Sequence, residues 1–174
     1  MKIILLSFLF FTSASSCSSD NNNSDGDSFS DELKPQVACE TISNKLLTEM
    51  FGWELEKIFQ QSLTHNEKRS ICSFGFDEEK LFVRLGWKSE KAQEMKTVEN
   101  QFKNYLSNGE NGINYSSLKG DELLFGSKTD QHNNMVYILR KRYGNKAEIQ
   151  LEFYTPNRTE EEVKKQLLSL LNKF

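Results

Sequence analysis

The chain has few prolines, histidines and cysteines, and it lacks both a block of like charge in its body and a long hydrophobic run. Pro35 and Pro156 are the only prolines among 174 residues, which excludes a collagenous or proline-rich disordered chain. The apolar stretch at residues 3–11 is shorter than the roughly 20 residues that a helix needs to cross a bilayer. Because acids and bases are interspersed, we expect no nucleic-acid partner.

Residues 1–16 have the pattern of an export signal. Lys2 supplies a positive end, residues 3–11 form a short apolar stretch, and small residues follow directly before Cys17. Small residues followed by this cysteine resemble the lipobox of bacterial lipoproteins. The resemblance implies that residues 1–16 are a cleaved signal peptide and that Cys17 is lipidated and holds the protein at a membrane. The alternative is an ordinary secreted protein in which Cys17 is incidental.

Residues 17–36 are predicted to form a flexible acidic tether behind the lipidated cysteine. The segment is mostly polar and buries too little apolar surface to offset the entropy of ordering. It carries a net charge of −4, whereas residues 37–174 contain 20 bases and 20 acids. Its Asp and Asn residues resemble the export signals of surface lipoproteins in Bacteroidetes-type bacteria, and a plain spacer is the alternative. By the same family analogy, Ser18 directly after the cysteine implies an outer-membrane lipid anchor, with the protein on the periplasmic or the surface-exposed face.

The three cysteines are an odd number for an exported protein. If Cys17 is lipidated, Cys39 and Cys72 remain, and outside the cytosol they can persist as a disulfide. The chain-entropy model gives such a bond about 4 kcal/mol of stability. A metal pair is the alternative, although neither His65 nor His132 forms a zinc-like spacing with the cysteines. We therefore predict a Cys39–Cys72 disulfide and neither a metal nor another cofactor.

Residues 37–174 are predicted to form a single domain that begins with a helix after Cys39. The helix is indicated by apolar residues at helical spacing, with Thr41 as its cap and Gly52 at its end. These apolar residues are Ile42, Leu46, Leu47, Met50 and Phe51. Residues 53–63 fit either a helix or a strand.

Two hairpins and a second helix are predicted in the middle and late parts of the domain. Residues 69–76 and 81–88 alternate as strands around a polar turn, with Cys72 facing inward together with Phe74 and Phe76. Residues 89–106 have the apolar stripe of a helix, and a Gly/Asn-rich loop follows. Further on, 122–125 is a possible short strand.

The second hairpin is predicted to have strands 135–143 and 146–154 around Gly144-Asn145. In that register Val136 and Ile138 share a face with the buried row of the second strand, and Lys141 lies opposite Glu148. The same register puts Arg140 and Arg142 on the apolar side, so either the sheet edge lies there or the register slips. The buried row is Ala147, Ile149, Leu151 and Phe153.

After Pro156, Thr159 and Glu162 form a capping box that starts an amphipathic helix reaching Phe174. The predicted fold class is α+β: an antiparallel sheet built from hairpins with packed helices, in the order α-ββ-α-(β)ββ-α.

This arrangement resembles the small envelope lipoproteins of the PsbP-like α/β-sandwich type. The resemblance is carried by a helix near Cys39, by Cys72-Ser73-Phe74 in the first strand, and by residues 118–122 before the last hairpin. It implies a non-catalytic binding or accessory module for an unidentified envelope protein or ligand, and it supplies no catalytic residues.

Local motifs for catalysis are scarce in the sequence. Neither a nucleophile elbow, a phosphate loop, a zinc helix nor a calcium loop occurs. His65 and His132 are predicted to be exposed loop residues, and the acids at 77–79 a solvated turn. Arg140, Lys141 and Arg142 are split between faces, so they do not indicate nucleic-acid binding. The phenylalanine-rich strands, with Trp53 and Trp87, are assigned to core packing, with a ligand cleft as the alternative.

The expected function is therefore a membrane-anchored binding module and not an enzyme. The alternative is a cell-envelope hydrolase in which His132 meets a carboxylate from Asp121 or Asp130 only in the folded chain.

Overall fold

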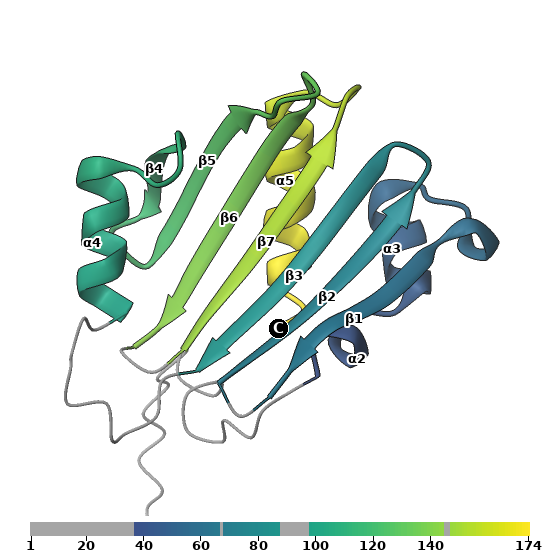
Figure 1. The fold of residues 1–174 in the computed structure, drawn as a ribbon, viewed down its shortest axis with the longest axis horizontal. Helices are drawn as coiled ribbons and strands as arrows, with labels where there is room; N and C mark the ends of the chain where they lie inside the picture. Colours follow the sequence, from purple (N-terminus) through teal and green to yellow (C-terminus); the bar gives the residue numbers. More distant parts are fainter. Residues whose placement is uncertain (1–36, 67, 88–97, 145–146) are drawn as a thin grey trace, which may run out of the picture.

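The computed structural model describes residues 37–66, 68–87, 98–144 and 147–174, so Cys17, the predicted signal peptide and the tether lie outside the described residues. Within these ranges, no helix is long and apolar enough to span a membrane. The described chain forms one seven-stranded antiparallel sheet with helices packed on it (Figure 1). The predicted α+β class with an antiparallel sheet is confirmed.

The predicted element order is wrong, because three strands precede the central helix and four follow it. The elements are α2 (Ala38–Thr41), α3 (Asn44–Phe51), the 3₁₀ helix η1 (Leu55–Lys57), β1 (Phe59–His65), β2 (Arg69–Phe76), β3 (Glu79–Trp87), α4 (Val98–Asn108), β4 (Asn114–Lys119), β5 (Leu123–Thr129), β6 (Met135–Tyr143), β7 (Ala147–Thr155) and α5 (Glu160–Leu171). The strands lie in the order β1-β2-β3-β7-β6-β5-β4. The two edge strands are β1, in a range that fits either a helix or a strand, and β4, which is not predicted. Their mostly exposed side chains give no clear alternation. Strand β5 is longer than the short strand at residues 122–125.

The first predicted helix is divided into two. After α2 the chain is extended at Ile42, and α3 starts from Ser43, whose side chain accepts a hydrogen bond from the Leu46 backbone N–H at 3.2 Å. Ser43, rather than the predicted Thr41, therefore caps the main helix. Gly52 ends it as predicted, with a φ of 73° that favours glycine. Residues 53–63 fit either a helix or a strand, and the structure contains both: residues 55–57 form the short helix η1, and residues 59–63 belong to strand β1.

The predicted register of the last hairpin is wrong by one residue. Tyr143 pairs with Ala147, so three residues separate the strands instead of two, and Arg142 rather than Lys141 lies opposite Glu148. A one-residue slip moves every side chain of a strand to the other face. Val136 and Ile138 therefore pack in the second core cluster, away from the buried row of β7. Alternation could not distinguish the registers, because β6 is apolar on both faces.

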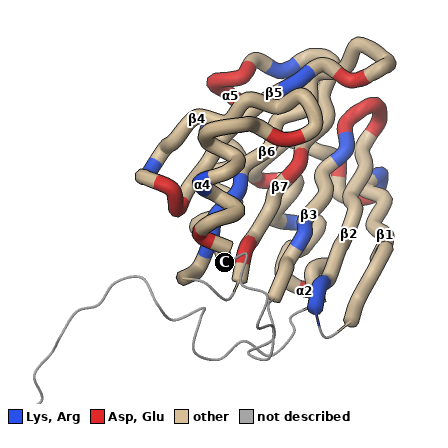
Figure 2. The backbone as a smooth tube through the Cα atoms, turned by 60° about the vertical axis from the view of Figure 1, so that its left-hand side comes forward, with Lys and Arg blue, Asp and Glu red and all other residues tan. Residues whose placement is uncertain are grey.

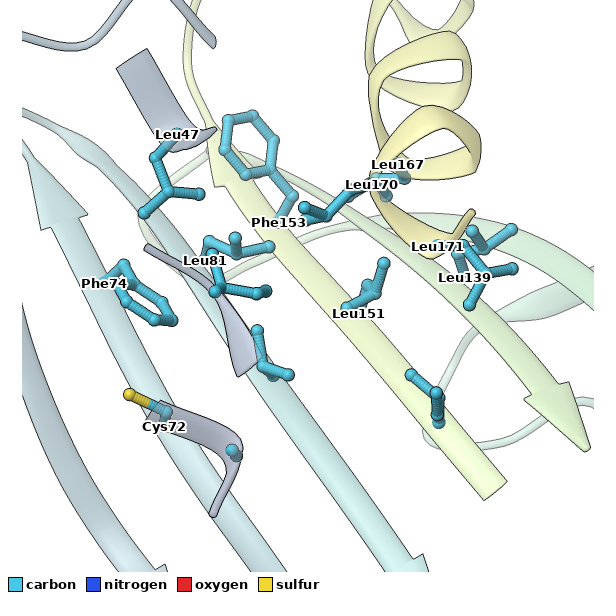
Figure 3. Packing of buried hydrophobic residues seen from close by; sticks show 14 of the residues in the cluster. Leu47, Cys72, Phe74, Leu81, Leu139, Leu151, Phe153, Leu167, Leu170 and Leu171 are labelled. Atoms are coloured by element: carbon cyan, nitrogen blue, oxygen red, sulfur yellow. The ribbon is translucent and has the colours of Figure 1, made fainter. Parts of the chain in front are cut away.

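The main core lies between one face of the sheet and helices α2, α3 and α5. Buried side chains from β2, β3, β6 and β7 meet Leu47 of α3 and Leu167 and Leu170 of α5 (Figure 3). The capping box of α5 forms as predicted between Thr159 and Glu162. Trp53 is buried within the main core, and the partly buried Trp87 packs against the main core.

The predicted disulfide is present and ties helix α2 to strand β2. Cys39 and Cys72 are bonded across a sequence separation of 33, with Cα atoms 5.1 Å apart. Cys72 is fully buried and points into the core from β2, together with Phe74 (Figure 3). The disulfide therefore belongs to the helix-covered core of the first face.

Glu79, one of the acids predicted to be solvated, instead accepts hydrogen bonds from three side chains beside this core. Glu79 accepts hydrogen bonds from Arg158 Nε at 2.6 Å, Trp53 Nε1 at 2.7 Å and Thr155 Oγ1 at 2.7 Å. Burial disfavours the ionised form, but the hydrogen bonds from Arg158, Thr155 and Trp53 outweigh it and lower the pKa of Glu79. Because Arg158 also donates to the Phe51 carbonyl at 2.7 Å, these hydrogen bonds join the end of α3 to the segment before α5.

Candidate functional site

The second face of the sheet is covered by a helix over only half of its width. Helix α4 packs on β4 and β6 through a smaller apolar cluster that includes Phe102, Ile113 and Ile138. Among the described elements no helix lies in front of β1, β2, β3 and β7 on this side (Figure 1). We call this uncovered half the open face. Register places on it Phe59, Gln61, Ile71, Ser73, Phe82, Arg84, Gln150 and Tyr154.

A hydrogen-bonded group on β3 and β7 orders the half of the open face that is nearer to helix α4. Glu152, which is only 8% exposed, accepts from Arg84 Nε at 3.2 Å, from Gln150 Nε2 at 3.1 Å and from the Tyr154 hydroxyl. Burial and the bond to Glu152 both raise the pKa of Tyr154, so the phenol stays protonated. The Arg84 guanidinium lies 5.5 Å from the centroid of Phe82, whose ring meets Tyr154 edge-on. These side chains are held in position before any ligand arrives.

A buried arginine fixes the boundary between the open face and helix α4. Arg140 donates to Tyr115 Oη at 3.0 Å and to Tyr105 Oη at 3.3 Å, and it pairs with Glu110. Its Nη1 also lies 3.9 Å from Glu148. The guanidinium is 4.3 Å from the centroid of Tyr105, and burial raises the pKa of this tyrosine to about 12. The sequence gives Arg140 no role of its own, whereas in the structure it contacts Tyr105 of α4 from strand β6.

A cleft of about 810 Å³ opens at one end of the open face. Strand β3 and the turn before it contribute Glu78, Lys80 and Phe82, and β7 contributes Tyr154. The opposite wall consists of residues 111–112 and of residues from the end of β5 to the start of β6. The cleft therefore combines two aromatic rings with a rim of amide and charged side chains.

The loop between β5 and β6 is shaped by Asp130. Its Oδ1 accepts from the backbone N–H groups of His132 at 2.8 Å and Asn134 at 2.9 Å. These backbone bonds, that from Asn134 foremost, lower the pKa of Asp130. Lys128 Nζ donates to the Asn111 carbonyl at 3.2 Å and so joins this loop to the one after α4.

The predicted site residues are distributed over separate parts of the fold. His132 lines the cleft and is exposed in the loop between β5 and β6, as predicted. His65 is exposed as predicted, but it is the last residue of strand β1 and not a loop residue. Asp121 lies in the turn between β4 and β5 and pairs with Arg142 Nη2 at 2.8 Å. Asp130 accepts from backbone N–H groups, including that of His132, and the His132 ring lies 3.2 Å from Gln131 Nε2. Among the described residues no hydrogen bond or ion pair joins this ring to Asp121 or Asp130.

The open-face group could have been found only in part from the sequence. Glu148, Gln150, Glu152 and Tyr154 alternate with the buried row of β7, which marks them as the opposite face. Glu152 and Arg84 are 68 residues apart in the sequence, and no local pattern indicates their pairing.

Within the described ranges, no group of three or more His, Cys, Asp or Glu side chains is placed to hold a metal ion. Comparison with protein-family models, curated proteins and solved structures found no match for this chain.

Proposed function

We propose that the protein is a lipid-anchored lipoprotein of the outer membrane that acts as a non-catalytic binding or accessory module. In this proposal Cys17 carries the anchor, residues 17–36 are the tether, and the folded domain presents the open face and its cleft to an envelope partner. The domain would resemble the PsbP-like sandwich lipoproteins in role as well as in element pattern.

The uncovered half of the second sheet face is the observation that carries the binding role. Phe59 is 63% exposed there. Phe82 and Arg84, two strands away on β3, and Tyr154 on β7 lie on the same face, where hydrogen bonds hold Arg84 and Tyr154. Aromatic and arginine side chains are enriched where proteins contact their partners. A surface that is already ordered also loses less conformational entropy on binding.

The cysteine pairing supports the proposed anchor. Cys39 and Cys72 are bonded to each other, so Cys17 is the one cysteine left for acylation. Several acyl chains on one residue hold a protein durably at a membrane, whereas a single chain does so only marginally.

Metabolic labelling with a fatty acid tests the anchor. We expect the native chain to incorporate label and to fractionate with the outer membrane, and the Cys17→Ala variant to lose both. Ser18→Ala is the matched control and should label normally. Equal labelling of the native and Cys17→Ala chains would contradict the proposal.

Site-specific photo-crosslinking in cells tests the binding face. A photoreactive residue at Gln61 or Ser73, both on the open face, should yield a discrete adduct with an envelope component. The matched control is Lys165, which is exposed on α5 on the other side of the sheet. Adducts of the same size at Lys165, or none at either open-face position, would count against a role for this face.

A further inference from the structure

We propose that the cleft at the end of the open face binds an uncharged oligosaccharide. The inference deepens the proposed function and rests on it, because it assigns a ligand class to part of the same surface. It depends on four properties of the cleft: size, charge balance, polar rim and aromatic floor.

The size of the cleft suits a short oligosaccharide. Its volume of about 810 Å³ lies within the ~300–1,000 Å³ that small-molecule sites occupy. The lining comes from four separate segments of the chain, namely the β2–β3 hairpin, the loop after α4, the segment from β5 to β6, and β7, so a ligand would be contacted from more than one side.

The charges of the cleft balance, which argues against an anionic or cationic ligand. Lys80 and Lys128 supply two positive charges, and Glu78 and Asp130 supply two negative charges. Two of these groups already have partners in the protein, because Asp130 binds backbone N–H groups and Lys128 binds a carbonyl. Acids and bases are also intermixed along the surrounding chain (Figure 2). A phosphate or a carboxylate would find no net positive field to favour it.

The rim of the cleft is built for a ligand with many hydroxyl groups. Asn111, Gln131 and Asn134 contribute amides, and His132 contributes a ring that donates or accepts. Amide side chains both donate and accept hydrogen bonds, as sugar hydroxyl groups do. An apolar ligand would remove water from these groups without replacing their hydrogen bonds, which disfavours its binding.

The floor of the cleft supplies the complementary apolar contact. The ring centroids of Phe82 and Tyr154 lie 5.5 Å apart, and the planes of the two rings are inclined by 68°. Tyr154 is held by its bond to Glu152, and the guanidinium of Arg84 packs against Phe82. A sugar ring has an apolar C–H face and hydroxyl groups around its edge. It can therefore pack on these aromatic rings and at the same time form hydrogen bonds with the amides of the rim.

Titration of the full chain carrying Cys17→Ala tests the inference without the anchor. The neutral probes are cellotriose, maltotriose and tri-N-acetylchitotriose, and the charged probes are trigalacturonate and inorganic phosphate. Calorimetry gives affinities, and backbone amide shifts locate the site. We expect saturable binding of at least one neutral trisaccharide, with shifts at residues 80–82 and 128–134. The acetylated and unacetylated probes distinguish an amino-sugar source from a hexose source.

Three variants determine whether the cleft is responsible. Phe82→Ala should weaken binding by about tenfold, the equivalent of one lost aromatic contact. Gln131→Ala, at an exposed position that does not support the core, should weaken it several-fold. Phe59→Ala, on the open face but outside the cleft, should bind as the unaltered chain does.

Absence of saturable binding by all three neutral probes would overturn the inference. So would tighter binding of trigalacturonate or phosphate, or an affinity that neither Phe82→Ala nor Gln131→Ala reduces. These failures would leave a crosslink from Gln61 or Ser73 standing, so the ligand class and the proposed binding role fail separately.

Discussion

Replacement of Arg140 by methionine tests whether the buried arginine holds helix α4 against the sheet. The side chain is 6% exposed and pairs with Glu110 and Glu148, whose side chains are 30% and 27% exposed. Methionine retains part of the side-chain volume but removes every donor. Tyr105 and Tyr115 then lose a hydrogen-bond donor, and both glutamates lose a cation.

We expect Arg140→Met to lower the free energy of unfolding by about 3–5 kcal/mol. This magnitude is that of breaking a buried ion pair and leaving a charge without its partner. It is a large fraction of the roughly 5–15 kcal/mol that stabilises a typical domain. Part of the loss should return when Glu110→Gln is added, because one unpaired charge is then removed.

Urea denaturation gives the free energy, and hydrogen exchange shows where the loss occurs. The matched control is Lys103→Met on α4, which removes an exposed pair with Glu99 and should cost no more than about 0.5 kcal/mol. Exchange of the α4 amides should accelerate in Arg140→Met and not in the control. A loss below about 1 kcal/mol, or equal losses in the two variants, would refute the assigned anchoring role.

Three further predictions concern the fold. Cys39→Ala combined with Cys72→Ala should lower the free energy of unfolding by about 4 kcal/mol, and reductant should then have no further effect; continued sensitivity to reductant would contradict this. Because the pKa of Glu79 is below its ordinary 4.5, its ionised form stabilises the fold above that pH and the contribution is lost as pH falls through the folded pKa. Glu79→Gln should remove this part of the acid dependence in urea titrations at several pH values, whereas an unchanged profile would exclude Glu79 as its source. A Cβ at Gly126 would lie 2.6 Å from Ile113 Cγ2, so Gly126→Ala should lower the free energy of unfolding, determined by thermal melting, by about 1–3 kcal/mol. In the control Gly75→Ala the nearest atom to the new Cβ lies at 3.9 Å, and the loss should be no more than about 0.5 kcal/mol. Equal losses in the two variants would contradict the close packing at Gly126.

The elements predicted correctly are those whose signal is local. Hairpin β2–β3 alternates cleanly, α5 has a capping box, and Gly52 ends α3 with a backbone that glycine favours. Each of these depends on residues a few positions apart. The disulfide was predicted from the number of cysteines rather than from geometry.

The errors and omissions arise where tertiary context decides. β6 is apolar on both faces because α4 covers one side and α5 the other, so alternation could not set its register against β7. Glu79 reads as one of several acids in a turn, and only the fold brings Arg158 to it. The same holds for Glu152 and Arg84, whose pairing across β3 and β7 orders the open face.

Intact-mass analysis of the mature protein, extracted from the membrane fraction and alkylated without reduction, tests the proposed lipoprotein most directly. We predict a chain that begins at Cys17, carries the mass of several acyl chains, contains one disulfide and shows no alkylated thiol. A chain that retains residues 1–16, or one in which Cys17 is alkylated and carries no lipid, would contradict the proposed anchor.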